Sequence, residues 1–121
     1  MIMANANYPR AERVRAAIHE VLAAEIERLK DPGVAFVTIT DVTMSPDLRH
    51  ATAYYTVYGG EVEHASTKDA LERATKHLRA VVAHEVRLRY VPQLDFKPDP
   101  VPERSERIDR LIAELHKKEE P

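Results

Sequence analysis

The stretch LERATKHLRAVVAHEVRLRYVPQLDF, residues 71–96, decides the fold of this chain. Its first part predicts a long amphipathic helix, continuous or broken in two, because apolar side chains recur at helical spacing at Leu71, Ala74, Leu78, Val81 and Val82. Pro92 ends that pattern, and the alternation of Leu94 and Phe96 with polar residues predicts a short strand. A basic helix that is set against a sheet offers a surface for phosphates.

The residues before this stretch predict a helix over 9–30, followed by strands over 34–44 and 51–58. A short turn at 45–47 joins the two strands, so we expect them to pair antiparallel as a hairpin. The apolar alternation of the first strand changes phase midway, and a β-bulge near Asp41 would restore it.

The remaining segments complete the order of elements. Gly59-Gly60 predicts a loop, and Ser66-x-x-Asp69 resembles the N-cap of the long helix. Apolar residues spaced three and four apart predict a last helix over 103–118. The order helix, strand, strand, long helix, strand, helix indicates an α+β fold. We expect one domain with a flexible N-terminus (1–8), a core (9–100) and a C-terminal helix with its tail (101–121).

The composition excludes several classes of site. None of the 121 residues is cysteine, which excludes disulfides, cysteine-ligated zinc and thiol chemistry. No signal peptide and no apolar run of membrane-spanning length is visible, so we expect a cytoplasmic protein without membrane contact. Three glycines cannot build a phosphate-cradling loop, and six histidines form no metal pair. Ser45, Asp47 and His50 indicate a turn rather than a catalytic triad. We therefore expect no cofactor, no metal and no catalysis.

The charge is unevenly distributed, although the whole chain has a formal net charge of −2. Residues 68–97 hold seven Lys or Arg and four Asp or Glu, a balance of +3, whereas residues 41–67 hold one Arg and four acids, a balance of −3. This is either the ordinary asymmetry of a solvated surface or a patch for a polyanion.

The long helix concentrates its positive charge on one side. At about 100° per residue, positions 73, 76, 77, 80, 83, 84 and 87 share a sector about 120° wide, and no carboxylate of the helix falls within it. Lysine and arginine on such a ridge attract nucleic-acid phosphates with little sequence information. The predicted RNA-binding residues are Arg73, Lys76, Arg79, Arg87 and Arg89, together with Arg10, Arg13 and Lys97, whose orientation the pattern leaves open.

Other functions stay open on these patterns. Tyr54 and Tyr58, on the wetter side of the second strand, could stack on the bases of single-stranded RNA. A small nuclease is a second alternative, and a protein-docking module that uses the last helix is a third.

Five motifs follow one another in a specific order and spacing over residues 10 to about 115. They are Arg10-x-x-Arg13-Val14, Ser45-Pro46-Asp47-Leu48-x-x-Ala51, Leu71-x-x-Ala74, Leu88-Arg89-x-x-Pro92-x-Leu94-x-Phe96-x-x-Asp99 and Arg107-Ile108. Each alone is common, but together they resemble the ribosome-binding factor A family.

This resemblance implies a type II KH-like domain (α-β-β-α-α-β) that lacks the GxxG loop and carries an additional C-terminal helix. It implies a non-catalytic, monomeric, cytoplasmic assembly factor that binds free 30S subunits. Such a factor assists late maturation and 5′-end processing of the 16S rRNA precursor, above all in the cold. The alternative is a generic single-stranded RNA-binding KH-like protein. Without GxxG the usual backbone clamp for four nucleotides is missing, so recognition of folded RNA by shape and charge remains.

The chain departs from the family pattern in the long helix. The family has Ala-x-Gly between its second and third helices, and this chain has Ala74-Thr75-Lys76. Because lysine has an ordinary helix preference, we expect a milder bend or a continuous helix, with one added positive charge. Val101 and Ser105 stand where the family usually has Ser and Gly, which stiffens the entry to the last helix.

Overall fold

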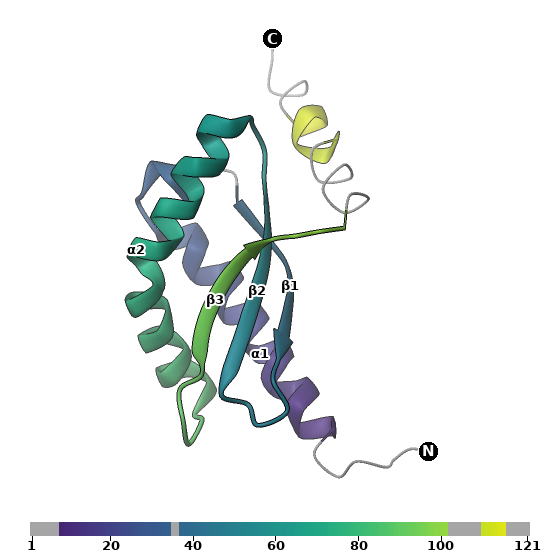
Figure 1. The fold of residues 1–121 in the computed structure, drawn as a ribbon, viewed down its shortest axis with the longest axis vertical. Helices are drawn as coiled ribbons and strands as arrows, with labels where there is room; N and C mark the ends of the chain where they lie inside the picture. Colours follow the sequence, from purple (N-terminus) through teal and green to yellow (C-terminus); the bar gives the residue numbers. More distant parts are fainter. Residues whose placement is uncertain (1–7, 35–36, 102–109, 116–121) are drawn as a thin grey trace.

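The computed structural model describes residues 8–34, 37–101 and 110–115. The elements are α1 (Tyr8–Arg28), the 3₁₀ turn η1 (Pro32–Val34), β1 (Val37–Met44), β2 (His50–Val57), α2 (Glu61–Val86) and β3 (Gln93–Pro98). Both helices lie on one side of a three-stranded sheet (Figure 1). The predicted first helix, hairpin, long helix and short strand are all present, which confirms an α+β fold.

The connectivity of the sheet brings four segments to one end of the molecule. β1 and β2 form the predicted antiparallel hairpin, and β3 pairs with β2 in parallel, in the order β1-β2-β3. A parallel partner requires the chain to return to the end where β2 began, and α2 makes that return. The start of α1, the β1–β2 turn, the end of α2 and the start of β3 therefore meet (Figure 1).

The predicted β-bulge is present in β1. Ile39 pairs with Tyr55 and Asp41 with Tyr54, so Thr40 is the extra residue. The insertion returns the apolar side chains that follow it to the inner face, and both Ile39 and Val42 are buried as a result.

The core lies between the helices and the sheet. Its largest fully buried aliphatic side chains are Ile18, Leu22, Val42, Leu71, Leu78 and Val82. The alanines of β2, Ala51 and Ala53, are also fully buried and let the helices approach the sheet closely. Truncating a buried leucine such as Leu78 to alanine costs about 2–5 kcal/mol, which makes α2 an integral part of the fold.

The start of α2 corrects the sequence prediction. The N-cap is Gly60 rather than Ser66, and the helix begins at Glu61. The backbone N–H of Gly60 donates to Glu63 Oε1 at 3.1 Å, and Glu61 and Glu63 place negative charge at the positive end of the helix. Ser66 therefore lies inside the first turns, because these acids supply a stronger start than its hydroxyl does.

A single helix joins β2 to β3, so the observed order is α-β-β-α-β. The resemblance predicted two helices there, as in a type II KH-like domain, and that detail is corrected. Of the two expected forms, a milder bend or a continuous helix, the structure has one uninterrupted α-helix through Ala74-Thr75-Lys76. Thr75 Oγ1 donates to the carbonyl of Leu71 at 2.8 Å, so its hydroxyl is satisfied within the helix. α2 ends at Val86, and Arg87 caps it in the left-handed conformation (φ 54°).

The start of β1 and the two terminal segments remain to be compared with the sequence predictions. The first strand starts at Val37 rather than at 34, because Val34 donates its N–H to the Asp31 carbonyl at 3.1 Å and closes η1. Residues 110–115 are helical, within the last helix predicted over 103–118. The remainder of that helix and the predicted N-terminal segment 1–7 lie outside the described residues. Over the described part of the chain, no helix has the length and apolarity to cross a membrane.

Candidate nucleic-acid interface

The eight predicted RNA-binding residues do not share one surface. Arg73 and Lys76 are exposed on α2, and Arg13 is exposed on α1. Arg79 turns toward the loop between α2 and β3. Lys97 follows Phe96 on β3 and therefore faces the side of the sheet away from the helices. Only Arg10 and Arg89 line a common hollow, and Arg87 precedes it in the chain.

Arg73 is neutralised by a carboxylate from another element. Its Nη2 donates to Asp31 Oδ2 at 2.7 Å. This hydrogen bond, with one from the Gly33 N–H, holds the pKa of Asp31 below its usual range, and the same carboxylate raises the pKa of Arg73. No carboxylate of α2 lies in the basic sector, as predicted, but the loop after α1 supplies Asp31, which neutralises the sector at Arg73.

His77 shows the same effect one turn further along α2. Its Nε2 lies 2.8 Å from Glu25 Oε2 on α1. The two helices pack side by side, so acids of α1 reach the basic side of α2. A helical projection of α2 alone cannot show these partners.

Arg79 has a structural role in the α2–β3 loop. Its Nε donates to the carbonyl of Pro92 at 3.1 Å, and its Nη2 donates to the carbonyl of Val91 at 3.4 Å. The side chain is half-buried and points inward. It therefore positions the loop that carries Arg89 rather than presenting its donors to a ligand.

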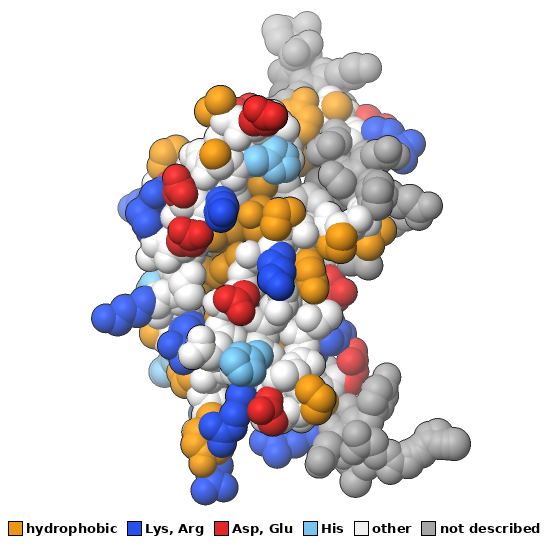
Figure 2. Space-filling view, in the orientation of Figure 1, with side chains coloured by type: hydrophobic (Ala, Val, Ile, Leu, Met, Phe, Trp, Pro, Cys, Tyr) orange, Lys and Arg blue, Asp and Glu red, His pale blue; other side chains and the backbone are white. Residues whose placement is uncertain are grey.

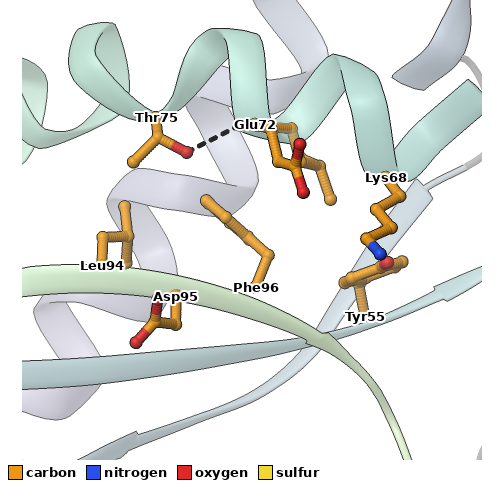
Figure 3. A pocket seen from close by; sticks show the side chains of 8 residues that line it. Tyr55, Lys68, Glu72, Thr75, Leu94, Asp95 and Phe96 are labelled. Carbon is orange, nitrogen blue, oxygen red and sulfur yellow. Dashed lines mark hydrogen bonds between the residues drawn. The ribbon is translucent and has the colours of Figure 1, made fainter.

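A cleft of about 140 Å³ between α2 and the sheet is the site in Figure 3. Lys68 and Tyr55 point toward one another at one end of the cleft (Figure 3). Glu72 projects from α2 toward the cleft, and Asp95 points away from it. Burial raises the pKa of Tyr55, and the nearby Glu72 carboxylate raises it further. With Lys68 offset by Glu72, this cleft lacks the positive charge that a phosphate needs.

Lys and Arg side chains gather toward the end of the molecule where α2 ends and β3 begins (Figure 2). We call this end the basic pole and define it by Arg10, Arg49, Arg87, Arg89 and Tyr90. Among the described residues that line its hollow, Asp47 is the one carboxylate. Across residues 8–34, 37–101 and 110–115, none of these four arginines forms an ion pair within 4 Å.

The ring of Tyr90 makes cation–π contacts with two of these arginines. The guanidinium carbon of Arg49 lies 4.3 Å from the centre of the Tyr90 ring, and that of Arg89 lies 5.4 Å from it. Cation–π contact orders both side chains without neutralising their charge. Arg49 and Tyr90 were missed by the sequence prediction. Both stand in turns far apart in the chain, and the parallel pairing of β2 with β3 brings them together.

Lys76 adds one further available cation on α2. It is exposed, and no carboxylate of the described residues pairs with it. The geometry can therefore attract a polyanion at the basic pole and, more weakly, beside Lys76.

Comparisons with known proteins agree with the sequence motifs. Residues 10–112 match the family model described as ribosome-binding factor A. The ribosome-binding factor A of Geobacter metallireducens is 43% identical over 113 residues, which cover 93% of this chain and 96% of that protein. The one from Saccharopolyspora erythraea is 44% identical over 110 residues, covering 90% of this chain and 66% of that longer protein.

Solved structures show the same relationship. The crystal structure of ribosome-binding factor A from Thermus thermophilus is similar with a TM-score of 0.67 at 32% identity, over 73% of this chain and 93% of that one. A homology model of the Thermus thermophilus factor, fitted into a cryo-EM map of a 30S complex, is similar with a TM-score of 0.61 at 33% identity, over 70% of this chain and 90% of that one. The chain belongs to the ribosome-binding factor A family.

Proposed function

We propose that this protein is a ribosome assembly factor that binds the free 30S subunit and contacts 16S rRNA with its basic pole. The observation that carries this proposal is that Arg10, Arg49 and Arg89 lie around one hollow whose lining includes a single carboxylate, Asp47, with Arg87 directly before that lining in the chain. The related Thermus thermophilus factor, fitted into a map of a 30S complex, supports the choice of partner. Lys76, exposed on α2, supplies a separate and weaker positive position.

The mechanism follows from binding alone. A factor without a catalytic group changes RNA only by binding one conformation better than another. Held at the basic pole, a late folding state of the 16S rRNA precursor would persist long enough for maturation of its 5′ end. The protein acts as a cytoplasmic monomer that leaves when the favoured RNA conformation changes.

Co-sedimentation with purified ribosomal particles over a salt series tests this proposal. We expect retention on 30S subunits and not on whole ribosomes. The logarithm of the affinity should fall linearly with the logarithm of salt, by about 0.7–0.9 for each phosphate contact. Salt-insensitive binding, or equal retention on whole ribosomes, contradicts the proposal.

A matched pair of charge reversals locates the contact. Arg89→Glu removes a cation of the basic pole, whereas Lys97→Glu makes the same charge change on the other side of the sheet. Arg89→Glu should weaken binding and reduce the salt slope, and Lys97→Glu should change both less. Equal effects of the two variants would show that only the total charge matters.

Two alternatives give different results in the same preparations. A nuclease would cleave precursor rRNA in the presence of EDTA, and we expect intact RNA. A generic single-stranded RNA binder would depend on Tyr54 and Tyr58. Tyr54 lies on β2 and Tyr58 directly follows it, and both side chains are half-buried. Replacing both tyrosines with alanine should then abolish binding, whereas we expect the salt-dependent 30S retention to survive.

A further inference from the structure

The basic pole contains a hollow of about 190 Å³ that simple phosphate attraction does not explain. It lies between the start of α1, the β1–β2 turn and the α2–β3 loop, and it is lined by Arg10, Asp47, Leu48, Leu88, Arg89 and Tyr90. Leu48 and Leu88 are half-buried against the core and give the hollow an apolar surface. Tyr90, beside them, is 51% exposed, so part of its ring is open to a ligand.

The backbone around this hollow is strained. Among the described residues, the non-glycine residues with positive φ are Leu48 (φ 59°), which lines the hollow, and Arg87 (φ 54°), the C-cap of α2, which directly precedes the lining residue Leu88. The left-handed conformation is unfavourable for a residue with a side chain. Such strain tends to collect at binding sites, where it sets the direction of a side chain. Here the two left-handed residues lie in the β1–β2 turn and at the end of α2, two segments that border the hollow.

Asp47 gives the rim of the hollow an acceptor that a phosphate site would avoid. Its Oδ1 accepts from Ser45 Oγ at 2.6 Å and from the Arg49 N–H at 3.0 Å. The Ser45 hydrogen bond, followed by that of Arg49, lowers the pKa of Asp47, so the group is ionised at neutral pH. No described residue donates to Oδ2, which remains for a ligand.

We propose that this hollow binds one unstacked RNA nucleotide and prefers guanine. Exposed aromatic rings and arginine planes stack on the faces of splayed-out bases. Leu48 and Leu88 would contact the base, and Arg10 and Arg89 would contact its phosphates. The Asp47 carboxylate favours guanine, because N1–H and N2–H₂ are two adjacent donors that can both approach Oδ2, whereas adenine, cytosine and uracil each offer one donor group on that edge. This inference rests on the proposed RNA-binding function and adds a base preference to it.

Four fluorescent RNA hexamers test the preference: UUGUUU, UUAUUU, UUCUUU and UUUUUU. In anisotropy titrations the intact protein should bind UUGUUU about 10-fold more tightly than UUUUUU, the gain expected from one additional hydrogen bond to a charged acceptor. Asp47→Asn keeps an oxygen for Ser45 and Arg49 but replaces Oδ2 by a donor, so the preference should vanish. Asp95→Asn removes the same charge from the outer side of β3 and should leave the preference unchanged.

The outcomes separate the possible roles of Asp47. If Asp47 only repels RNA, Asp47→Asn strengthens binding of all four hexamers alike and leaves their order unchanged, which overturns the inference. Equal affinity of the intact protein for all four hexamers also overturns it.

A second variant tests the stacking. Tyr90→Leu should weaken binding of every hexamer by about 5- to 150-fold, the range of one base–aromatic stack, and Tyr90→Phe should retain binding. If Tyr90→Leu fails to fold, NMR mapping on the intact protein replaces it. Guanosine monophosphate should then shift the amides of residues 47–49 and 88–91 more than uridine monophosphate does. Shifts elsewhere, or equal shifts for both nucleotides, overturn the inference.

Co-sedimentation with 30S subunits separates this inference from the proposed function. If the intact protein is retained on 30S subunits but shows no guanine preference in the hexamer titrations, the proposed guanine site is overturned and the proposed 30S-binding function stands. Failure of the intact protein to bind 30S subunits overturns the proposed function itself.

Discussion

The middle of α2 and the basic pole are both rich in cations, but they differ in how those cations are held. In the middle of α2, Arg73 pairs with Asp31, and His77 lies against Glu25. At the basic pole, Arg49 and Arg89 lie against the ring of Tyr90. A carboxylate cancels the charge it orders, whereas an aromatic ring orders a guanidinium and leaves its charge and donors available. Availability for a polyanion therefore depends on the partner, not on the number of cations.

Paired charge reversals in the two regions should give the largest contrast. We expect Arg49→Glu with Arg89→Glu to reduce 30S affinity by about 100-fold or more, because two charge-assisted contacts are lost and replaced by repulsion. Arg73→Glu with His77→Glu should reduce it much less, since carboxylates already face both positions. Quantitative co-sedimentation at low salt measures both affinities, and circular dichroism checks that each variant is folded. A larger loss from the α2 pair would reverse the comparison.

Arg79 connects the two regions, because it lies on α2 and holds the loop of the basic pole. Arg79→Met leaves the carbonyls of Val91 and Pro92 without their donor and should lower the free energy of unfolding by about 1–3 kcal/mol. Urea denaturation measures this change. Arg79→Lys is the control, since it keeps the charge but loses the forked geometry. Weaker 30S binding with unchanged stability would instead identify Arg79 as a direct RNA contact.

Lys76→Gly tests whether the unbroken helix in the middle of α2 affects stability and 30S binding. Glycine in a helix interior costs about 1 kcal/mol relative to alanine, so Lys76→Gly should be less stable than Lys76→Ala by that amount. Both variants lose the same charge, and both should weaken 30S binding slightly and equally. Urea unfolding and co-sedimentation give the two quantities. Stronger binding by Lys76→Gly than by Lys76→Ala would show that a bend, rather than the charge, limits the contact.

Asp31→Asn should have the smallest effect and should make the middle of α2 more like the basic pole. Removing the carboxylate frees Arg73, so 30S binding should strengthen modestly, while the amide oxygen of the introduced asparagine still accepts from the Gly33 N–H. Co-sedimentation at low salt measures the change. A decrease in affinity would show that Arg73 serves RNA binding only when Asp31 positions it.

The contribution of the Asp31–Arg73 ion pair to stability should depend on pH in a defined direction. The folded-state pKa of Asp31 lies below its usual value near 3.9, so the pair contributes stability above that value and loses it as the pH falls through the folded pKa. The stability difference between the natural chain and Asp31→Asn should therefore shrink from pH 6 toward pH 3. Urea denaturation at a series of pH values measures it, and a difference that grows on acidification contradicts the pairing.

Local patterns determined most of the fold. The 3.6-residue repeat of Leu71, Leu78 and Val82 and the two-residue alternation of Leu94 and Phe96 identify elements because each period reflects which side of one element is buried. The phase change in β1 located the bulge for the same reason. The start of α2 was less predictable, because the weak signal at Ser66 competed with the acids at Glu61 and Glu63, and the stronger end charge prevailed.

The family also followed from the order and spacing of motifs, whereas the interface required the tertiary structure. The sequence located the cations of α2 and the arginine at position 89, but an ion pair or a ring contact joins residues from different elements. Asp31 reaches Arg73 across 42 positions of the chain, and Arg49 meets Tyr90 only because β2 and β3 begin at the same end of the sheet. Which charges are cancelled and which remain open is a property of packing, because electrostatic partners are chosen by distance in space.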